Sequence, residues 1–378
     1  MARFKEFIIL MVQTVILVVI TLFCLAPISC KLTEEGIHFV SGDYVAPAIE
    51  TVEVIDEKTV QMNFSEGIKI SSVVVSKMVE EISDSMEHSG TESLSPAIAA
   101  AGGEFGTVGV ATSVSEDGTA VTFLMEEECE IGQAYEIYGV VEDKTGNTLS
   151  FCVPFTGYNS HLPKVLMTEL LVKYGTGTIK KETVYRCEFV ELLALTDGNL
   201  AGLEIVSGSD GEKKKYQIPP VEVKAGEVIV VHLRSVGEGC ITETDNLNES
   251  TAQHSAKNCR DIWSSNESAC LNDKTDVVIL RNGPDGAIMD AFMYAEDGAE
   301  AWKKSCLSFA EDAAAAGIYA SSDISEACSS KGLSPLQSFQ RKDAASLKNA
   351  ALAGTLEEYP VTNNLEFWEI SSAKPGAL

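Results

Sequence analysis

Residues 187–206 read CEFVELLALTDGNLAGLEIV, and this stretch decides the fold class. Apolar and polar side chains alternate at its start, residues 189–192, as they do in a strand with one buried face. The turn-forming triplet Asp-Gly-Asn follows at 197–199, and a second apolar run begins at Leu200. The stretch therefore predicts two short β-strands around a tight polar turn.

The same short, alternating runs separated by Gly, Asp and Asn recur along most of the chain. The 378 residues have room for two domains of ordinary size. We predict an all-β fold of two tandem β-sandwiches, at residues 46–160 and 164–378, joined by a brief linker. The resemblances described below imply that both are immunoglobulin-like. One insertion, 71–109, interrupts the first sandwich, and two insertions, 237–270 and 301–330, interrupt the second.

Two of these insertions have helical features. In the first, apolar residues recur near helical spacing, at Val74, Val75, Met78, Val79 and Ile82, which predicts a short amphipathic helix. In the last, an alanine-rich run at 309–319 predicts a second helix, expected to cover an open end of the sandwich. The middle insertion is long and polar, and loops of that length are usually functional or disordered.

Residues 164–378 resemble the lamin-tail domain, an immunoglobulin-like β-sandwich also found in exported bacterial proteins. The matching segments are EFVEL at 188–192, LAGLEI at 200–205, KAGEVIVV at 224–231, DGAIMDAFMY at 285–294, and FW with KPG at 367–376. These are mostly packing and turn positions, so the resemblance implies a fold and carries little about chemistry.

Residues 46–160 resemble the bacterial Ig-like domains of surface proteins. The resemblance rests on VQMNFSEG at 60–67, GTAVTF at 118–123 and VEDKTGN at 141–147. The last segment also predicts a turn between two strands, with Gly146 where a positive φ is needed.

The amino terminus predicts an export signal. Arg3 and Lys5 form a basic start, and residues 7–23 are nearly all apolar. Because about 20 apolar residues can span a bilayer, a retained signal anchor is the alternative to a cleaved signal.

Cys30 follows the small residue Ser29 and precedes polar residues, which resembles a bacterial lipoprotein cleavage box. The resemblance implies a signal peptide over 1–29, an acylated Cys30 that holds the protein on a membrane, and a polar tether over 30–45.

Eight of the ten cysteines lie beyond this region, and no Cys-x-x-Cys occurs. An even number in an exported chain favours structural disulfides over metal or redox chemistry. The candidates are Cys129, Cys152, Cys187, Cys240, Cys259, Cys270, Cys306 and Cys328. Connectivity cannot be deduced from spacing, although proximity in sequence suggests Cys129–Cys152 and Cys306–Cys328.

The net charge of the chain limits the kinds of partner that it can bind. The 56 acidic residues outnumber the 28 basic ones, so the net charge is −28. Such a surface repels phosphate backbones, and we expect no direct nucleic-acid binding.

Two candidate sites remain. Arg260 and Trp263 are the best candidates for a recognition surface, and the alternative is a tryptophan that caps the sandwich edge. Glu169, Glu188 and Glu191 are weak candidates for a metal or acid–base site, the alternative being strand positions that face water.

Enzyme signatures are missing from the sequence, which has no Gly-x-Ser-x-Gly elbow, His-Glu-x-x-His, phosphate loop or Gly-x-Gly-x-x-Gly. We therefore predict no catalytic residue, no cofactor and no enzyme activity.

The predicted function is that of a membrane-anchored, exported lipoprotein, which displays two sandwiches for adhesion or for binding a protein or glycan partner. Its expected place is the bacterial cell envelope, at the outer membrane or cell surface rather than the inner membrane. One alternative is an accessory factor or metal-dependent hydrolase acting on extracellular nucleic acid or polysaccharide. Another is a structural envelope component.

Overall fold

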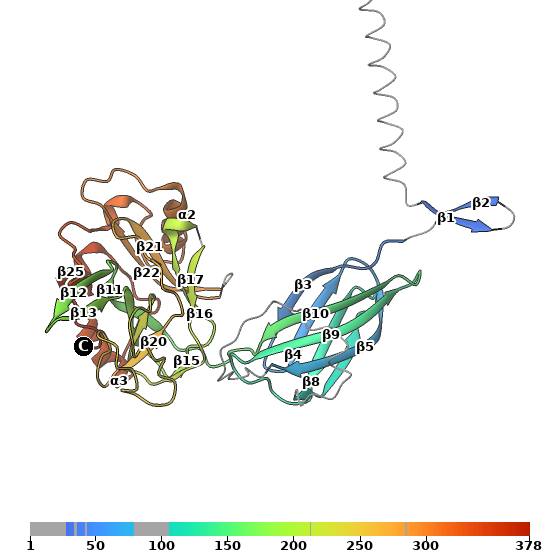
Figure 1. Ribbon diagram of the computed structural model, residues 1–378, viewed down its shortest axis with the longest axis horizontal. Helices are drawn as coiled ribbons and strands as arrows, with labels where there is room; N and C mark the ends of the chain where they lie inside the picture. Colours follow the sequence, from blue (N-terminus) through green and yellow to red (C-terminus); the bar gives the residue numbers. More distant parts are fainter. Residues whose placement is uncertain (1–27, 34–35, 42–43, 79–105, 212, 284–285) are drawn as a thin grey trace, which may run out of the picture. The chain divides into compact units, whose positions relative to one another are not determined.

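A computed structural model of the protein describes residues 28–33, 36–41, 44–78, 106–211, 213–283 and 286–378. Its contacts divide the chain into two units, the first reaching residue 156 and the second extending from 157 to 378, with residues 130–133 joining the second. Both units are built of β-strands (Figure 1), which confirms the predicted all-β class. Among the described residues, no helix is both long enough and apolar enough to cross a membrane.

The first described segment is a short hairpin. Strands β1 (Ile28–Thr33) and β2 (Gly36–Ser41) pair antiparallel, and Cys30 lies opposite Phe39 in their register. Most of this hairpin lies in the segment 30–45, which the sequence predicts to be a polar tether. Residues 1–27, most of the predicted signal peptide, lie outside the described residues.

The first unit contains two four-stranded antiparallel sheets, ordered β3-β4-β8-β7 and β10-β9-β5-β6. Their strands are β3 (Ile49–Val54), β4 (Thr59–Phe64), β5 (Ile68–Lys77), β6 (Thr107–Val108), β7 (Val110–Val114), β8 (Ala120–Met125), β9 (Ala134–Asp143) and β10 (Thr148–Thr156). Alternate residues of β4, β8 and β9 are buried, and they form one apolar core, as in a β-sandwich.

The amphipathic helix predicted near residue 74 is wrong over the described part of that insertion. Val74 and Val75 belong to β5, which pairs along its length with β9. β-branched side chains prefer the pleated surface of a sheet, and this pairing outweighs the helical spacing. Residues 79–105 lie outside the described residues.

The second unit is built on two larger sheets, ordered β20-β19-β14-β11-β24-β25 and β17-β16-β21-β22-β23. The first contains β11 (Val165–Leu171), β14 (Phe189–Ala194), β19 (Val228–His232), β20 (Arg260–Trp263), β24 (Gln337–Arg341) and β25 (Trp368–Ser372). The second contains β16 (Leu203–Ser207), β17 (Lys214–Gln217), β21 (Asp276–Asn282), β22 (Ile288–Ala295) and β23 (Cys328–Ser329). The β12 (Gly175–Ile179) and β13 (Glu182–Arg186) hairpin and a short antiparallel pairing of β15 (Gly198–Asn199) with β18 (Glu222–Val223) complete the unit.

The two strands predicted around the turn at 197–199 are β14 and β16. They do not pair with each other: β14 lies in the six-stranded sheet and β16 in the five-stranded sheet. Leu192 and Ile205 both face the apolar core shared by the two sheets. The turn therefore carries the chain from one layer to the other.

Both outer faces of the second unit are also covered. Helix α2 (Lys304–Ala315) packs against β21 and β22 through Phe309 and Ala310, which confirms the helix predicted in this insertion. It covers a sheet face rather than the expected open end (Figure 1). Helix α3 (Ala344–Ala353) and the last residues of the chain pack on the outer face of the six-stranded sheet. Strands such as β11 and β14 are consequently buried on both faces.

Candidate functional site

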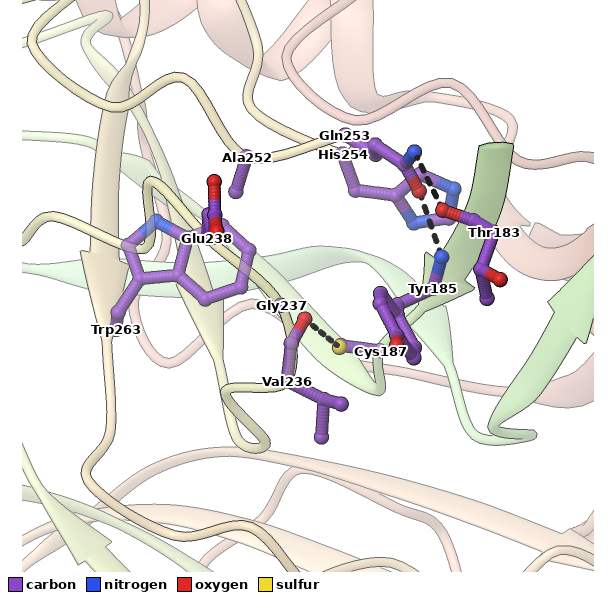
Figure 2. A pocket seen from close by; sticks show the side chains of 10 residues that line it. All are labelled: Thr183, Tyr185, Cys187, Val236, Gly237, Glu238, Ala252, Gln253, His254 and Trp263. Atoms are coloured by element: carbon purple, nitrogen blue, oxygen red, sulfur yellow. Dashed lines mark hydrogen bonds between the residues drawn. The ribbon is translucent and has the colours of Figure 1, made fainter. Parts of the chain in front are cut away.

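A cavity of about 360 Å³ opens beside the β12–β13 hairpin of the second unit (Figure 2). It lies where β13 meets the loop that follows β19 and part of the 237–270 insertion. Its lining residues are Thr183, Tyr185, Cys187, Val236, Gly237, Glu238, Ala252, Gln253, His254 and Trp263. This volume is at the lower end for small-molecule sites, which usually span roughly 300–1,000 Å³.

The Gln253 side chain fixes one wall of the cavity. The Tyr185 backbone N–H donates to Gln253 Oε1 at 2.6 Å, and Gln253 Nε2 donates to the Thr183 carbonyl at 3.1 Å. Figure 2 shows both bonds. The primary amide thus pairs with the edge of β13 as a neighbouring strand would, and it ties the insertion to the hairpin.

Gly237 allows the opposite loop to come close to Tyr185. Its φ of +102° lies in the region that favours glycine, and a Cβ there would meet a ring carbon of Tyr185 at 2.9 Å. Any other residue at 237 would push the loop away from the tyrosine ring and change the shape of the cavity.

A buried polar cluster supports the cavity at the end of β19 and β20. The His232 ring stacks on the Trp263 indole at a centroid distance of 3.6 Å, and its Nε2 lies 2.9 Å from Asp261 Oδ1. Glu243 accepts hydrogen bonds from the backbone N–H groups of Ser250 and Asp261, each at 3.0 Å. Because His232, Asp261 and Glu243 are fully buried, this cluster holds the insertion onto the sheet and is not open to a ligand.

Two of the ionisable groups that line the cavity, His254 and Cys187, are neutral near pH 7. Burial, with smaller effects of His232 and Arg186, lowers the pKa of His254 to about 4. Burial also raises the pKa of the Cys187 thiol to about 11. A reactive cysteine needs a lowered pKa, so these two groups do not form a thiolate–imidazolium nucleophile. Among the described residues, the buried Nδ1 of His254 has no hydrogen-bond partner.

The predicted recognition residues Arg260 and Trp263 are both buried in edge strand β20, which corrects their expected role as an exposed surface. Arg260 Nε lies 2.8 Å from Glu227 Oε1, and its guanidinium also donates to the carbonyl of Glu243. Trp263 caps the edge of the sheet, as in the alternative interpretation, while also lining the cavity.

The three candidate carboxylates are buried and do not face water. Glu169 and Glu191 lie opposite each other on β11 and β14, on the face that the C-terminal residues cover. Glu169 accepts from the Lys374 backbone N–H at 3.0 Å, and Glu191 accepts from the Gly376 backbone N–H at 2.6 Å. These two carboxylates anchor the end of the chain on the sheet.

Glu188 has a separate environment. Arg234 Nε lies 2.8 Å from Glu188 Oε2, and the Arg234 guanidinium stacks over the Tyr174 ring at 4.2 Å from its centroid. The three carboxylates therefore have protein partners in two different places. Within the described residues, no group of three or more His, Cys, Asp or Glu side chains is arranged to hold a metal ion.

The eight candidate disulfide cysteines are all free thiols in this structure, which corrects the two suggested pairings. Cys129 is buried in the core of the first unit, whereas Cys152 is exposed on β10. Cys306 lies on the buried face of α2, whereas Cys328 belongs to the core between the two sheets. In each suggested pair, the two thiols are close in sequence but lie in different surroundings.

Sequence reasoning missed most of the cavity. It recognised the 237–270 insertion as shaped, but it assigned no role to Tyr185, Glu238 or Gln253. The Gly237-Glu-Gly239 segment beside Cys240 was the one available signal, because glycines at a loop entrance permit close backbone approach.

Comparison with known proteins gives a family match for the second unit. Residues 163–370, more than half of the chain, match the family model TP_1001_2nd, described as "protein second domain". A Treponema pallidum (strain Nichols) protein named "Uncharacterized protein" is 27% identical over 176 residues, which are 46% of this chain and 42% of that protein. The chain thus spans less than half the length of this relative.

Solved structures give only weak alignments. A DUF4876 family protein from Bacteroides thetaiotaomicron VPI-5482 aligns with a TM-score of 0.28 and 8% identity, over 72% of this chain and 82% of that one. The N-terminal part of the bacterial S-layer protein SbsC aligns with a TM-score of 0.23 and 12% identity, over 40% of this chain and 41% of that one.

Proposed function

The chain belongs to the TP_1001 second-domain family, and we propose that its second unit is a non-catalytic binding module carried by an exported, membrane-anchored protein. The single observation that carries the binding role is the cavity beside β13, with walls fixed by Gln253 and Gly237. A ligand site of this kind needs a preformed concave shape and a few placed polar groups.

The lining favours a small ligand, or a partner side chain, that carries N–H donors. The two oxygens of the Glu238 carboxylate provide hydrogen-bond acceptors at the cavity wall. The aromatic rings of Tyr185 and Trp263 offer apolar surface beside these acceptors (Figure 2). An ammonium group combines donors with a charge that suits both a carboxylate and aromatic rings.

The non-catalytic part of the proposal is supported by the protonation states in the cavity. Cys187 remains a thiol and His254 remains a neutral imidazole near pH 7, so neither supplies an activated nucleophile. The metal-dependent hydrolase alternative would need the carboxylates of Glu169, Glu191 and Glu188. These already contact the backbone N–H groups of Lys374 and Gly376 and the Arg234 guanidinium, respectively.

Export and anchoring are proposed from the amino terminus, where a basic start and an apolar run precede Cys30. An acylated Cys30 would hold both units outside the cytoplasm, in the bacterial cell envelope. The lamin-tail and Ig-like resemblances fit a protein that displays two β-sandwiches, and the partner would be a protein or glycan.

Intact mass of the protein extracted from membranes tests the anchor. We expect a chain that begins at an acylated Cys30, and we expect the Cys30→Ala variant to lose the acyl mass. A mass that includes the whole leader would instead make it a signal-anchored protein.

Thermal shift and tryptophan fluorescence of the full chain with ethanolamine, choline, N-acetylglucosamine and a dipeptide test the cavity. We expect an ammonium-bearing probe to bind and Glu238→Gln to weaken its binding about tenfold or more, since a charge-assisted hydrogen bond is worth roughly 1.5–3 kcal/mol. The exposed loop variant Glu267→Gln is the matched control and should bind normally. Equal binding by both variants would show that the cavity is not the binding site. Chemical turnover of a probe, if Glu238→Gln abolishes that turnover, would show that the cavity is catalytic.

A further inference from the structure

Two cysteines from distant segments meet at one turn of the second unit. Cys187 precedes β14, and its Sγ donates to the Val236 carbonyl at 4.0 Å. Cys240 lies in the 237–270 insertion, and its Sγ donates to the next carbonyl, that of Gly237, at 3.8 Å. The Cys240 thiol also interacts with the Val236 backbone, so the two sulfurs share an acceptor.

Cys240 also lies near enough to affect the pKa of Cys187. A charge on Cys240 disfavours ionisation of Cys187 and adds to the effect of burial on its pKa. The remaining cysteines of the second unit pack elsewhere: Cys259 lies in the cluster that includes α3, Cys306 on the buried face of α2, and Cys270 and Cys328 between the sheets.

We infer that Cys187 and Cys240 form a disulfide bond in the exported protein, and that this bond locks the Val236–Gly237 turn that lines the cavity. The inference rests on the proposed function in one respect: the protein must lie outside the cytoplasm, where the surroundings are oxidising enough to form disulfides. It goes beyond that function, because it assigns a covalent modification site and a pairing that spacing in the sequence does not suggest.

The oxidant is a low-molecular-weight or protein disulfide. Cys240 is the more exposed thiol, so its thiolate attacks one sulfur of that disulfide, forms a mixed disulfide and releases the other sulfur as a thiolate. The Cys187 thiolate then attacks Cys240 Sγ, forms the Cys187–Cys240 bond and releases the second thiolate. The two cysteines lose two protons and two electrons, and the oxidant is reduced to two thiols.

The bond would change how the cavity is held. At present, weak S–H donors and the Tyr185 contact of Gly237 hold the turn beside β13. A disulfide demands a Cα–Cα separation of about 4.4–6.8 Å, so it would tie the loop after β19 directly to the segment that leads from β13 into β14.

The test treats the purified, folded full chain with glutathione disulfide, alkylates the remaining thiols and maps peptides without reduction. We expect a peptide pair joining Cys187 to Cys240, a loss of two hydrogen atoms from the intact mass, and slower backbone hydrogen exchange over residues 236–240. Mapping of the unsubstituted protein needs no variant, so it does not depend on whether a variant folds.

Variants then establish the pairing. Cys187→Ser and Cys240→Ser should each abolish the cross-link, whereas Cys152→Ser, which removes the exposed thiol of the first unit, should retain it. Alkylation of both thiols after oxidation, or a cross-link from either one to Cys259 or Cys270, would overturn the inference. Probe binding by the reduced protein is measured separately, so failure of the disulfide and failure of the proposed function are distinguishable.

Discussion

At the scale of single residues, Glu191 shows what burial does to an acidic side chain in this protein. Burial raises its pKa from 4.5 to about 7, the neighbouring Glu169 adds to the increase, and the hydrogen bond from Thr168 opposes it. Its second oxygen accepts the Gly376 backbone N–H. The carboxyl group that anchors the end of the chain is therefore harder to ionise in the folded state than in the unfolded state.

This raised pKa predicts that Glu191 itself destabilises the second unit progressively as pH rises from about 4.5 to about 7. Below that window the carboxyl is protonated in both states; within it the unfolded chain releases a proton that the folded chain retains. Glu191 should therefore lower the free energy of unfolding by at most about 1.4 kcal/mol per pH unit. Urea unfolding at several pH values, followed by tryptophan fluorescence, measures the slope, because all three tryptophans lie in the second unit.

Glu191→Gln should reduce that slope, since the amide does not titrate. The exposed carboxylate variant Glu366→Gln is the control and should leave the slope unchanged. An identical pH dependence in the wild-type and Glu191→Gln proteins would show that Glu191 has an ordinary pKa.

At the scale of elements, coverage by α2 converts the five-stranded sheet into a layer buried on both faces. Phe309 is 6% exposed, and its ring approaches Gly208, where an added Cβ would lie 3.0 Å from Phe309 Cγ. Leu307, two residues earlier on the same helix, is 39% exposed. The helix thus offers a buried and an exposed apolar side chain for direct comparison.

Phe309→Ala should lower the free energy of unfolding of the second unit by about 3–5 kcal/mol, through lost burial and the cavity left behind. Leu307→Ala should change it by no more than about 0.5 kcal/mol. Equal losses from the two variants in urea unfolding would mean that α2 does not pack as described.

The β12–β13 hairpin depends on a side chain from a distant loop. Removing the Gln253 amide leaves the Tyr185 N–H and the Thr183 carbonyl without their partner at the edge of β13. Gln253→Ala should therefore speed hydrogen exchange of the Tyr185 amide about fivefold or more, since a net hydrogen bond is worth roughly 1 kcal/mol.

Hydrogen exchange of a peptide over residues 182–186, read by mass spectrometry, measures this opening. Asn246→Ala removes another amide of the same insertion, one that bonds only to Glu249 among the hydrogen bonds described, and it is the control. Faster exchange in both variants would point to general loosening of the insertion instead of a specific anchor.

At the scale of the whole molecule, acid acts on the two units in opposite directions. Burial alone would raise the pKa of Asp143, but hydrogen bonds from Asn147 and Thr145 outweigh it and lower the pKa from 3.8 to about 2. This group stabilises the first unit above pH 3.8, and the stabilisation is lost as pH falls toward 2. Glu191 acts over a different window: it stabilises the second unit as pH falls from about 7 to about 4.5, and that gain is complete below pH 4.5.

Hydrogen exchange at pH values between 2 and 7, quenched and analysed by mass spectrometry with correction for intrinsic rates, should show this divergence. Protection of β9 and β10 should fall below pH 4, and Asp143→Asn should already reduce it at pH 7. Protection of β11 and β14 should be greatest in the acidic range. A parallel response of both units would contradict these pKa shifts.

The amino-acid sequence by itself determined the β class, the turns and the presence of a helix in the last insertion, because each depends on residues within a few positions of one another. Gly146 at the β9–β10 turn, with φ of +94°, and the alternation in β4 are of this kind. The bounds of that helix, predicted at 309–319, are 304–315 in the structure. The strand β5 was mistaken for a helix, since its valines fit both periods and pairing with β9 decided between them.

Only the tertiary structure decided that Glu169, Glu191, Arg260 and Trp263 are buried. Alternation tells which side chains share a face of a strand, but not whether another part of the chain will cover that face. Glu191 meets the Gly376 N–H, 185 positions away, and the cavity wall depends on Gln253 reaching Tyr185. Burial is a property of the assembled layers, and so the site arises where segments distant in sequence pack together.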